Sequence, residues 1–352
     1  MPLWEDKIRK VVPYTPGEQP KEAGIIKLNT NENPYPPSPA VKRALTDLPD
    51  TDLRKYPDPA VSELVGALAS RYGRKPSEVF VGVGSDDVLA MCFLTFFNSK
   101  DKPVLFPDIT YSFYDVWADL FRIPYETIPL DDAFRIRPEQ YIRENGGIVF
   151  PNPNAPTGRA MPLADAEKII AANPGSIVIV DEAYVDFGAE SAVGLIPKYD
   201  NLIVVQTFSK SRSLAGMRIG YALGNEKLIG YLNDCKYSFN SYTMNRTTIA
   251  AGCAALSDEK WFQKHVGKVI RTRERAEKEF AALGFRFYPS ASNFLFVTHP
   301  EKPAAEIFEE LRKRHIYVRY FAKPRIDNYL RVTIGTEEEM DVLFAALKEI
   351  LA

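Results

Sequence analysis

Cysteine and histidine are scarce in this sequence, and each scarcity argues against a class of protein. Only three cysteines and three histidines occur among 352 residues. So few cysteines do not make the disulfide framework that holds small secreted domains together, and they favour a reducing, cytoplasmic compartment. The histidines, His265, His299 and His315, lack the spacing of metal ligands. We therefore expect no metal site.

Long apolar runs and an excess of one charge are also missing. The 44 basic and 46 acidic residues give a net charge of −2, and no basic stripe marks a nucleic-acid surface. No segment is apolar for long enough to cross a membrane, and the charged first ten residues do not resemble a secretion signal. We therefore expect neither nucleic acid nor a membrane as a partner.

The chain does contain enough apolar material for a large core. Hydrophobic residues make up 45% of the sequence and charged residues 26%, which are ordinary proportions for a globular protein. At this length we expect two lobes. We predict an N-terminal arm over residues 1–50 that joins the smaller lobe, a large domain over residues 51–257 and a small C-terminal domain over residues 258–352.

Residues 51–257 alternate between short apolar runs and helical patterns. This alternation predicts an α/β domain with a mainly parallel sheet that is covered on both faces. The expected strands cover residues 79–83, 104–106, 148–150, 177–180 and 202–205, with helices that start near residues 86, 111 and 163. The later residues indicate an α+β domain, with helices over 260–283 and 304–314, strands over 294–297, 316–319 and 329–334, and a final helix.

The most informative stretch is residues 207–220, which read TFSKSRSLAGMRIG. Lys210 follows an expected strand and stands among small hydroxyl residues. A lysine in this setting can bind pyridoxal phosphate through an imine, while Thr207, Ser209 and Arg218 supply donors for the phosphate dianion. A solvated basic loop would have the same composition, so this stretch alone leaves both interpretations open.

Other polar residues stand directly after expected strands, where ligands bind in parallel α/β sheets. Gly84, Ser85 and Asp86 open a helix whose first amides can hold an anion, although the same residue types are common helix caps. Asp181 can hold a protonated pyridine nitrogen or be an ordinary strand-end residue. Tyr184, three residues further on, can reach an oxygen on the same ring.

Three more positions complete the pattern. Tyr111 can stack on a flat ring or pack in the core. Arg319 and Arg331 stand on two short strands of the small domain, where guanidinium groups can bind a carboxylate or a phosphate. Each arginine alone could equally be a surface ion-pair residue. The order and strand-end placement of all these residues together favour one composite site between the lobes.

These segments resemble the fold-type-I pyridoxal-phosphate aminotransferases, and among them the histidinol-phosphate aminotransferase branch. The resemblance extends from residue 13 to residue 335. It rests on the segments LNTNENP (28–34), YPD (56–58), GSD (84–86), TY (110–111), APTG (155–158), DEAY (181–184), SK (209–210), GMRIG (216–220) and LRVTIG (330–335). The DEAY and SK segments are specific for the superfamily, while Tyr14 and VRYF (318–321) favour the branch.

The resemblance implies a role for each residue. Lys210 would bind the cofactor covalently and later move a proton between the substrate Cα and the cofactor C4′. Asp181 would pair with the pyridine nitrogen and Tyr184 with the ring oxygen, while Tyr111 would stack on the ring. The phosphate would be bound by Gly84, Ser85, the amide of Asp86, Thr207, Ser209 and Arg218.

The resemblance also implies partners. Tyr56 would reach the cofactor phosphate from a neighbouring subunit, so that the enzyme would be an obligate homodimer. Arg331, Arg319 and Tyr14 would bind the anionic group of a small-molecule substrate.

One position departs from the family pattern. The family carries an asparagine directly before Pro-Thr-Gly, where it bonds to the ring oxygen, but this chain has Ala155 there. Asn154 stands one place earlier. Either the turn shifts so that Asn154 reaches the ring oxygen, or Tyr184 does so alone.

The activity implied is transfer of the amino group of L-histidinol phosphate to 2-oxoglutarate, a step of histidine biosynthesis. An aromatic-amino-acid aminotransferase and a threonine-phosphate decarboxylase share the same scaffold and stay open as alternatives. A ligand-sensing module of a transcription regulator is disfavoured, because the sequence has neither a spare N-terminal domain nor a basic helix.

Overall fold

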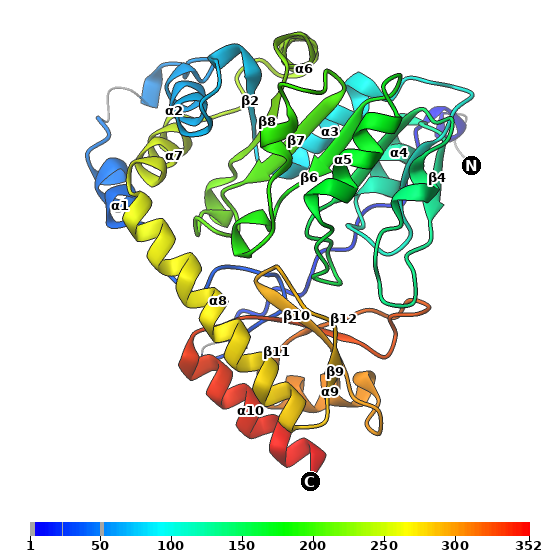
Figure 1. Ribbon diagram of the computed structural model, residues 1–352. Helices are drawn as coiled ribbons and strands as arrows, with labels where there is room; N and C mark the ends of the chain where they lie inside the picture. Colours follow the sequence, from blue (N-terminus) through cyan, green and yellow to red (C-terminus); the bar gives the residue numbers. More distant parts are fainter. Residues whose placement is uncertain (1–3, 23, 50–52) are drawn as a thin grey trace.

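The computed structural model describes residues 4–22, 24–49 and 53–352, which form two lobes connected by a long helix (Figure 1). The larger lobe contains a seven-stranded sheet in the order β2-β8-β7-β6-β5-β3-β4. Its strands are β2 (Val79–Gly82), β3 (Val104–Pro107), β4 (Tyr125–Ile128), β5 (Gly147–Pro151), β6 (Val178–Asp181), β7 (Leu202–Thr207) and β8 (Gly220–Gly224). Its helices are α2 (Ser62–Tyr72), α3 (Ser85–Phe96), α4 (Tyr114–Phe121), α5 (Leu163–Ala172), α6 (Glu226–Phe239) and α7 (Arg246–Ser257).

The central strands are apolar along their length because both faces of the sheet are covered. Every residue of β5, β6 and β7 is buried. Within β6, Val178 and Val180 belong to the core on one face and Ile179 to the core on the other. Strands β3 to β7 run parallel, whereas β8 is antiparallel to both β2 and β7. The predicted fold class is confirmed, while the reversed strand β8 was not predicted.

Helix α4 begins later than the sequence indicated. The predicted helix started near Tyr111, but α4 begins at Tyr114. The amide of Tyr114 donates to the carbonyl of Tyr111 over 3.3 Å, which forms a turn before the helix. Tyr111 therefore lies in the loop that follows β3.

The smaller lobe combines a four-stranded antiparallel sheet, in the order β12-β13-β10-β9, with helices. Its elements are α8 (Glu259–Ala282), β9 (Arg286–Phe287), β10 (Phe294–Thr298), α9 (Ala304–Lys313), β11 (Ile316–Tyr317), β12 (Arg319–Tyr320), β13 (Leu330–Thr333) and α10 (Glu337–Leu351). Arg319 of β12 stands directly opposite Arg331 of β13. This pairing brings two guanidinium groups to the side of the sheet that bears the site.

The N-terminal segment contacts both lobes. Strand β1 (Ile26–Lys27) pairs in parallel with β11 of the small lobe, whereas α1 (Pro39–Thr46) packs against α7 of the large lobe. The division into an arm and two domains stays a prediction. Its first boundary, at residues 50 and 51, lies outside the described residues.

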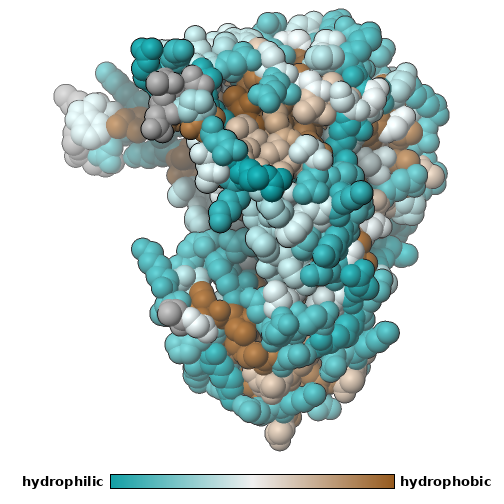
Figure 2. Space-filling view, turned by 90° about the vertical axis from the view of Figure 1, so that its left-hand side faces the viewer, coloured by the Kyte–Doolittle hydropathy of each residue, from teal (hydrophilic) through white to brown (hydrophobic). Residues whose placement is uncertain are grey.

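Each lobe has its own hydrophobic core. In the small lobe, α8 contributes Val266, Val269 and Phe280 to a cluster that also includes Leu295 of β10. In Figure 1, α8 runs from the large lobe down along the small one, and Figure 2 shows a notch in the surface between the upper and lower parts of the molecule. None of the helices in the described residues combines the length and the apolar composition that a bilayer span requires.

Candidate active site

The polar residues that follow the parallel strands meet at one edge of the large sheet. Lys210 lies three residues after β7, Asp181 ends β6, and Ser85 begins α3 just after β2. All three line one cavity of about 180 Å³. The residues predicted to bind the cofactor that line this cavity are Ser85, Asp86, Tyr111, Asp181, Tyr184, Thr207, Ser209, Lys210 and Arg218.

The side chain of Lys210 is held by the N-terminal segment. Its Nζ donates to the carbonyl of Thr30 over 3.0 Å and lies 5.9 Å from the centre of the Tyr184 ring. The carbonyl of Lys210 accepts a hydrogen bond from Nδ2 of Asn33 over 3.0 Å. Across the described ranges, no carboxylate forms an ion pair with this amine. The amine therefore faces the cavity with a single backbone acceptor.

Asp181 is a buried carboxylate with no cationic partner in the described part of the chain. It is 4% exposed and accepts hydrogen bonds from the hydroxyl of Tyr114 over 2.7 Å and from the amide of Ala183 over 3.2 Å. Burial raises the pKa of Asp181 to about 6. A cation against this carboxylate would favour its ionised form, so the position fits the protonated nitrogen of a pyridine ring.

Another wall of the same cavity is rich in hydrogen-bond donors. Gly84 has a φ of +86°, which favours glycine, and its Cα side faces the guanidinium of Arg218. Ser85 is the first residue of α3, whose N-terminus favours an anion. The hydroxyl oxygens of Thr207 and Ser209 lie 2.9 Å apart. This donor set fits a phosphate group.

The ring of Tyr111 has a fixed orientation along the cavity. Its hydroxyl donates to Oδ1 of Asp86 over 2.6 Å, and Oδ2 of the same carboxylate accepts from Nη2 of Arg218 over 3.2 Å. Burial, together with the charge of Asp86, raises the pKa of Tyr111, so its hydroxyl stays protonated. A ring held in this way suits stacking against a flat ligand.

A second cavity, of about 160 Å³, adjoins the first. The residues common to the two are Thr30, Tyr111, Ala155, Tyr184 and Lys210. The second cavity adds Tyr14, Arg319 and Arg331, the residues expected to bind the substrate anion. The arm, β12 and β13 therefore each bring one predicted substrate residue to the lysine.

The two arginines concentrate positive charge in this second cavity. Nη2 of Arg331 donates to the carbonyl of Asn29 over 2.8 Å, and burial lowers the pKa of this guanidinium. The guanidinium carbons of Arg319 and Arg331 lie 5.5 Å and 5.6 Å from the centre of the Phe321 ring. Neither forms an ion pair within the described residues. Their charges are therefore available to an anionic ligand.

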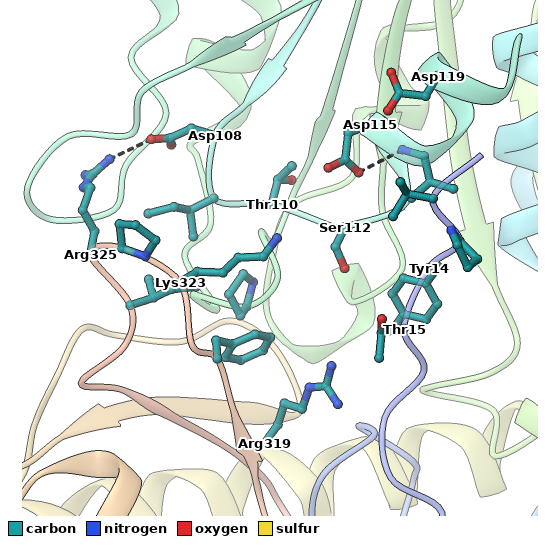
Figure 3. Close-up of a pocket in the computed structure, with 18 residues that line it drawn as sticks. Tyr14, Thr15, Asp108, Thr110, Ser112, Asp115, Asp119, Arg319, Lys323 and Arg325 are labelled. Atoms are coloured by element: carbon teal, nitrogen blue, oxygen red, sulfur yellow. Dashed lines mark hydrogen bonds and ion pairs between the residues drawn. The ribbon is translucent and has the colours of Figure 1, made fainter. Parts of the chain in front are cut away.

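A wider cavity of about 480 Å³ lies beside the second one and is drawn in Figure 3. Tyr14 from the arm, Ser112 from the loop before α4 and Arg319 from the small lobe point toward the same space. At another side of this cavity, Nη1 of Arg325 pairs with Oδ2 of Asp108 over 2.8 Å. Both lobes and the arm thus contribute to its walls.

Of the residues predicted to bind the cofactor, Gly84, Asn154 and Tyr56 are not among those that line the cavity of Lys210 and Asp181. Gly84 directly precedes Ser85, which does line it, whereas Asn154 and Tyr56 are two side chains with other contacts. Asn154 is 1% exposed, and its Nδ2 donates to the carbonyl of Ile109 over 2.9 Å and to Oγ1 of Thr157 over 3.0 Å. Both of its N–H groups are thus engaged, one within the turn and one with the loop that follows β3, and Ala155 lines the cavity instead. The structure therefore does not support Asn154 as a donor to the ring oxygen.

Tyr56 is the second of these residues. Its side chain is 77% exposed, and its ring centre lies 4.7 Å from that of Tyr242. The predicted contact of Tyr56 with the cofactor of a neighbouring subunit stays a prediction.

Sequence reasoning missed three residues of the site. Tyr114 was not among the predicted residues, and Thr30 acts through its backbone carbonyl, which no side-chain pattern reveals. Nδ2 of Asn31 donates to the hydroxyl oxygen of Tyr184 over 2.9 Å. The asparagine-rich segment 28–34 was the available signal, since a buried amide side chain requires hydrogen-bond partners.

Comparison with known proteins places these features in a family. The pattern of the family "Aminotransferase class I and II" matches residues 23–347. A histidinol-phosphate aminotransferase of Aromatoleum aromaticum is 52% identical over 352 residues, which is 99% of this chain and 99% of the relative. One of Clostridium beijerinckii is 51% identical over 349 residues, with 99% and 97% covered.

A solved structure shares the fold at recognisable sequence identity. Histidinol-phosphate aminotransferase from Sinorhizobium meliloti, crystallised in complex with pyridoxal-5′-phosphate, has a TM-score of 0.82 and 28% identity, covering 93% of this chain and 90% of that chain. Fold and site together define a pyridoxal-phosphate-dependent transaminase. The chain belongs to the family of class I and II aminotransferases. The predicted enzyme class and cofactor are confirmed, and the amine of Lys210, the carboxylate of Asp181 and the donors around Gly84 fit that cofactor.

We predict that Asp181→Asn changes how the stability of the cofactor-free protein depends on pH. The folded-state pKa of about 6 exceeds the ordinary value of 3.8, so the unfolded chain loses this proton first as the pH rises. Asp181 should therefore lower the free energy of unfolding by about 3 kcal/mol in total between about pH 4 and pH 6. Asparagine keeps an acceptor for Tyr114 and removes this effect.

The measurement is urea denaturation of both proteins at several pH values from 4 to 7. The free energy of unfolding of the variant should increase relative to that of the unchanged protein as the pH rises. The buried Glu182, whose pKa burial raises to about 7, is present in both proteins and cancels in the comparison. If the two proteins differed in free energy of unfolding by the same amount at every pH in this range, the prediction would be contradicted.

Proposed function

We propose that this aminotransferase transfers the amino group of L-histidinol phosphate to 2-oxoglutarate, giving imidazole-acetol phosphate and L-glutamate in histidine biosynthesis. One observation carries the proposal: Arg319 and Arg331 stand opposite one another in the cavity that also contains Lys210. Two guanidinium groups suit the phosphate of the amino donor. The names of the full-length relatives support the same substrate.

Each residue has a task in this reaction. The cofactor, when bound, supplies a ring that accepts the amino group and spreads the charge formed as the substrate Cα–H bond breaks. Asp181 keeps a proton on the ring nitrogen, because its buried carboxylate has no other cation in the described chain. Lys210, which only a backbone carbonyl holds, can take up and return the proton at the substrate Cα.

The same arginine can serve both substrates. The amino donor brings a phosphate and 2-oxoglutarate brings a carboxylate, and a guanidinium fork binds either group through two parallel hydrogen bonds. Arg331 has one Nη2 contact to a backbone carbonyl and no carboxylate partner in the described residues. Arg319 and Tyr14 approach from β12 and from the arm, so they can add to the phosphate contact.

Two other activities would use the same cofactor cavity. An aromatic-amino-acid aminotransferase is favoured by the aromatic wall of the second cavity, which includes Tyr14, Tyr111 and Phe321. A threonine-phosphate decarboxylase would also use the paired guanidinium groups, but it would release carbon dioxide and need no amino acceptor. These activities are distinguished by the reaction rates of the enzyme with different amino donors.

We predict that histidinol phosphate is the preferred amino donor. Enzyme loaded with pyridoxal phosphate is mixed separately with histidinol phosphate, phenylalanine, tyrosine and threonine phosphate, and the absorbance of the lysine-bound cofactor is followed. Histidinol phosphate should discharge this band fastest, because it offers both an anion for the arginines and a flat ring for the aromatic wall. Faster discharge by phenylalanine or tyrosine, or carbon dioxide release from threonine phosphate without 2-oxoglutarate, would refute the assignment.

The Lys210→Ala protein serves as the blank in this screen. It lacks the amine that forms the covalent bond and should show neither the band nor more than about one thousandth of the turnover. Lys210→Arg keeps the positive charge beside Thr30 and should behave in the same way.

We predict that Arg331→Gln lowers kcat/KM by about 100-fold for both histidinol phosphate and 2-oxoglutarate, because a charged group that pairs with substrate is lost. Arg325→Gln is the matched control, since that guanidinium is already paired with Asp108. The control should change kcat/KM by less than about threefold. Steady-state kinetics with each substrate varied in turn is the measurement, and equal losses in the two variants would count against the proposed role.

We also propose that two copies of the chain form a homodimer in the cytoplasm. The aromatic side chains of Tyr56 and Phe239 are 77% and 71% exposed, as expected of a surface that a partner covers. Arg218 lines the cofactor cavity and also a further cavity that includes residues 243–245, 247 and 248. A side chain of the other subunit could reach the cofactor phosphate through this further cavity. The scarcity of cysteine supports the reducing compartment.

We predict that Tyr56→Phe weakens the binding of pyridoxal phosphate about tenfold, because one hydrogen bond to the phosphate is lost. Mixing this variant with Lys210→Ala subunits should produce hybrid dimers. One of the two sites then has the original Lys210 from one subunit and the original Tyr56 from the other. Titration with limiting pyridoxal phosphate should then show recovered affinity in part of the sites. A monomer in sedimentation at micromolar concentration, or no recovery after mixing, would argue against the shared site.

A further inference from the structure

Asn31 occupies an unusual place in the site. It lies in the N-terminal segment, is 1% exposed and has a φ of +56°, in the left-handed region that asparagine tolerates better than most residues. Its backbone carbonyl accepts a hydrogen bond from Nδ2 of Asn293 over 3.0 Å. Its side chain points between Thr333 of the small lobe and Tyr184 of the large lobe. The residue is therefore fixed in a position that backbone preference alone would not select.

The hydroxyl of Thr333 fixes the orientation of the side-chain amide of Asn31. This hydroxyl oxygen accepts a hydrogen bond from the backbone N–H of Asn31 over 3.0 Å and donates its one proton to Oδ1 of Asn31 over 3.1 Å. Since Oδ1 must face that proton, Nδ2 faces the other way, toward Tyr184. The hydroxyl oxygen of Tyr184 is therefore the acceptor in its 2.9 Å contact with Asn31.

This contact leaves the proton of Tyr184 without a protein acceptor. A phenol has one proton to donate, and here the bond to Asn31 occupies the oxygen as an acceptor only. Among the described residues, the Tyr184 hydroxyl donates to none. Tyr184 lines both cavities that contain Lys210. Its proton is therefore free to bond to a ligand in them.

We propose that Asn31 is a positioning residue that makes Tyr184 a hydrogen-bond donor toward the ring oxygen of the cofactor. This chain has such a need because Ala155 lines the cavity at the position where the family pattern carries an asparagine donor. With that donor absent, and with both N–H groups of Asn154 bonded to Ile109 and Thr157, Tyr184 is the side chain that can supply the bond. The inference rests on the cofactor role of Tyr184 within the proposed function, but not on the identity of the amino donor.

The expected effect of losing the Tyr184 donor is measurable in the absorbance of the lysine-bound cofactor. A donor to the ring oxygen stabilises negative charge on that oxygen and so weakens its hold on the proton of the nitrogen linked to Lys210. Loss of the donor should raise the pKa of the lysine-bound chromophore, which a pH titration of its visible absorbance measures without substrate. The titratable and charged groups that line the two cavities are unchanged in the Asn31→Gly protein; they are Tyr14, Glu32, Asp86, Tyr111, Asp181, Tyr184, Lys210, Arg218, Arg319 and Arg331.

Two substitutions of Asn31 test the proposal. Asn31→Gly keeps the left-handed backbone and removes the donor without adding charge, and it should raise the chromophore pKa by about half a unit. Asn31→Asp keeps the shape and the contact to Thr333 but turns the group facing Tyr184 into an acceptor for its proton, so the rise should be about one unit or more. Either variant alone suffices if the other does not fold.

The control variants separate this role from a merely structural one. In the Tyr184→Phe background, Asn31→Gly should no longer shift the pKa, and adding Ala155→Asn to Asn31→Gly should return it toward the original value. Asn328→Ala removes an amide side chain that lines neither cavity and whose Oδ1 accepts from the backbone N–H of Ala304 over 2.9 Å, and it should leave the chromophore pKa unchanged. An unchanged pKa in both Asn31 variants, or the same Asn31→Gly shift with and without the Tyr184 hydroxyl, would overturn the proposal.

Discussion

The active site depends on one short segment that lies between the two lobes. The lysine that we propose binds the cofactor belongs to the large lobe, while the arginines that we propose bind the substrate anion belong to the small one. Residues 29–33 bond to both: the carbonyl of Asn29 accepts from Arg331, and the carbonyl of Thr30 accepts from Lys210. The pairing of β1 with β11 anchors this segment in the small lobe just before it reaches the site. Its backbone therefore sets the separation between the covalent and the anion-binding parts of the site.

Unpaired charge is the second constraint. Asp181 is buried with no cation beside it, and Arg331 is partly buried with no carboxylate beside it, in the described part of the chain. Each arrangement disfavours the folded protein on its own, because a desolvated charge without a partner is unfavourable. A ligand with a positive ring nitrogen at one end and an anion at the other removes both penalties. Asp181 and Arg331 are thus perturbed groups whose partners a ligand would supply, which is typical of functional sites.

The parts of the site that the sequence predicts are those that follow directly from local pattern. A buried parallel strand is a continuous apolar run, so the polar residues after it, such as Asp181 and Lys210, are found by position alone. Contacts between distant segments are not visible in this way. The reversed direction of β8 and the contact of Tyr114 with Asp181, 67 positions apart, both depend on tertiary packing. Asn154 is a further case, since its residue type fitted the expected role but its two donors are used by Thr157 in the same turn and by the carbonyl of Ile109, 45 positions away.

The hydrogen bonds of Asn31 also connect the chemistry to the arrangement of the lobes. Its amide bonds to Thr333 at the end of β13 and to Tyr184 just after β6, positions that belong to different sheets. A shift of the small lobe would lengthen one of these hydrogen bonds before it changed the contacts within the large lobe. The donor strength of Tyr184 would then fall, and with it the stabilisation of charge on the ring oxygen. A site with two independent donors would not respond in this way, so the alanine at position 155 makes the electronic state of the cofactor depend on contact between the lobes.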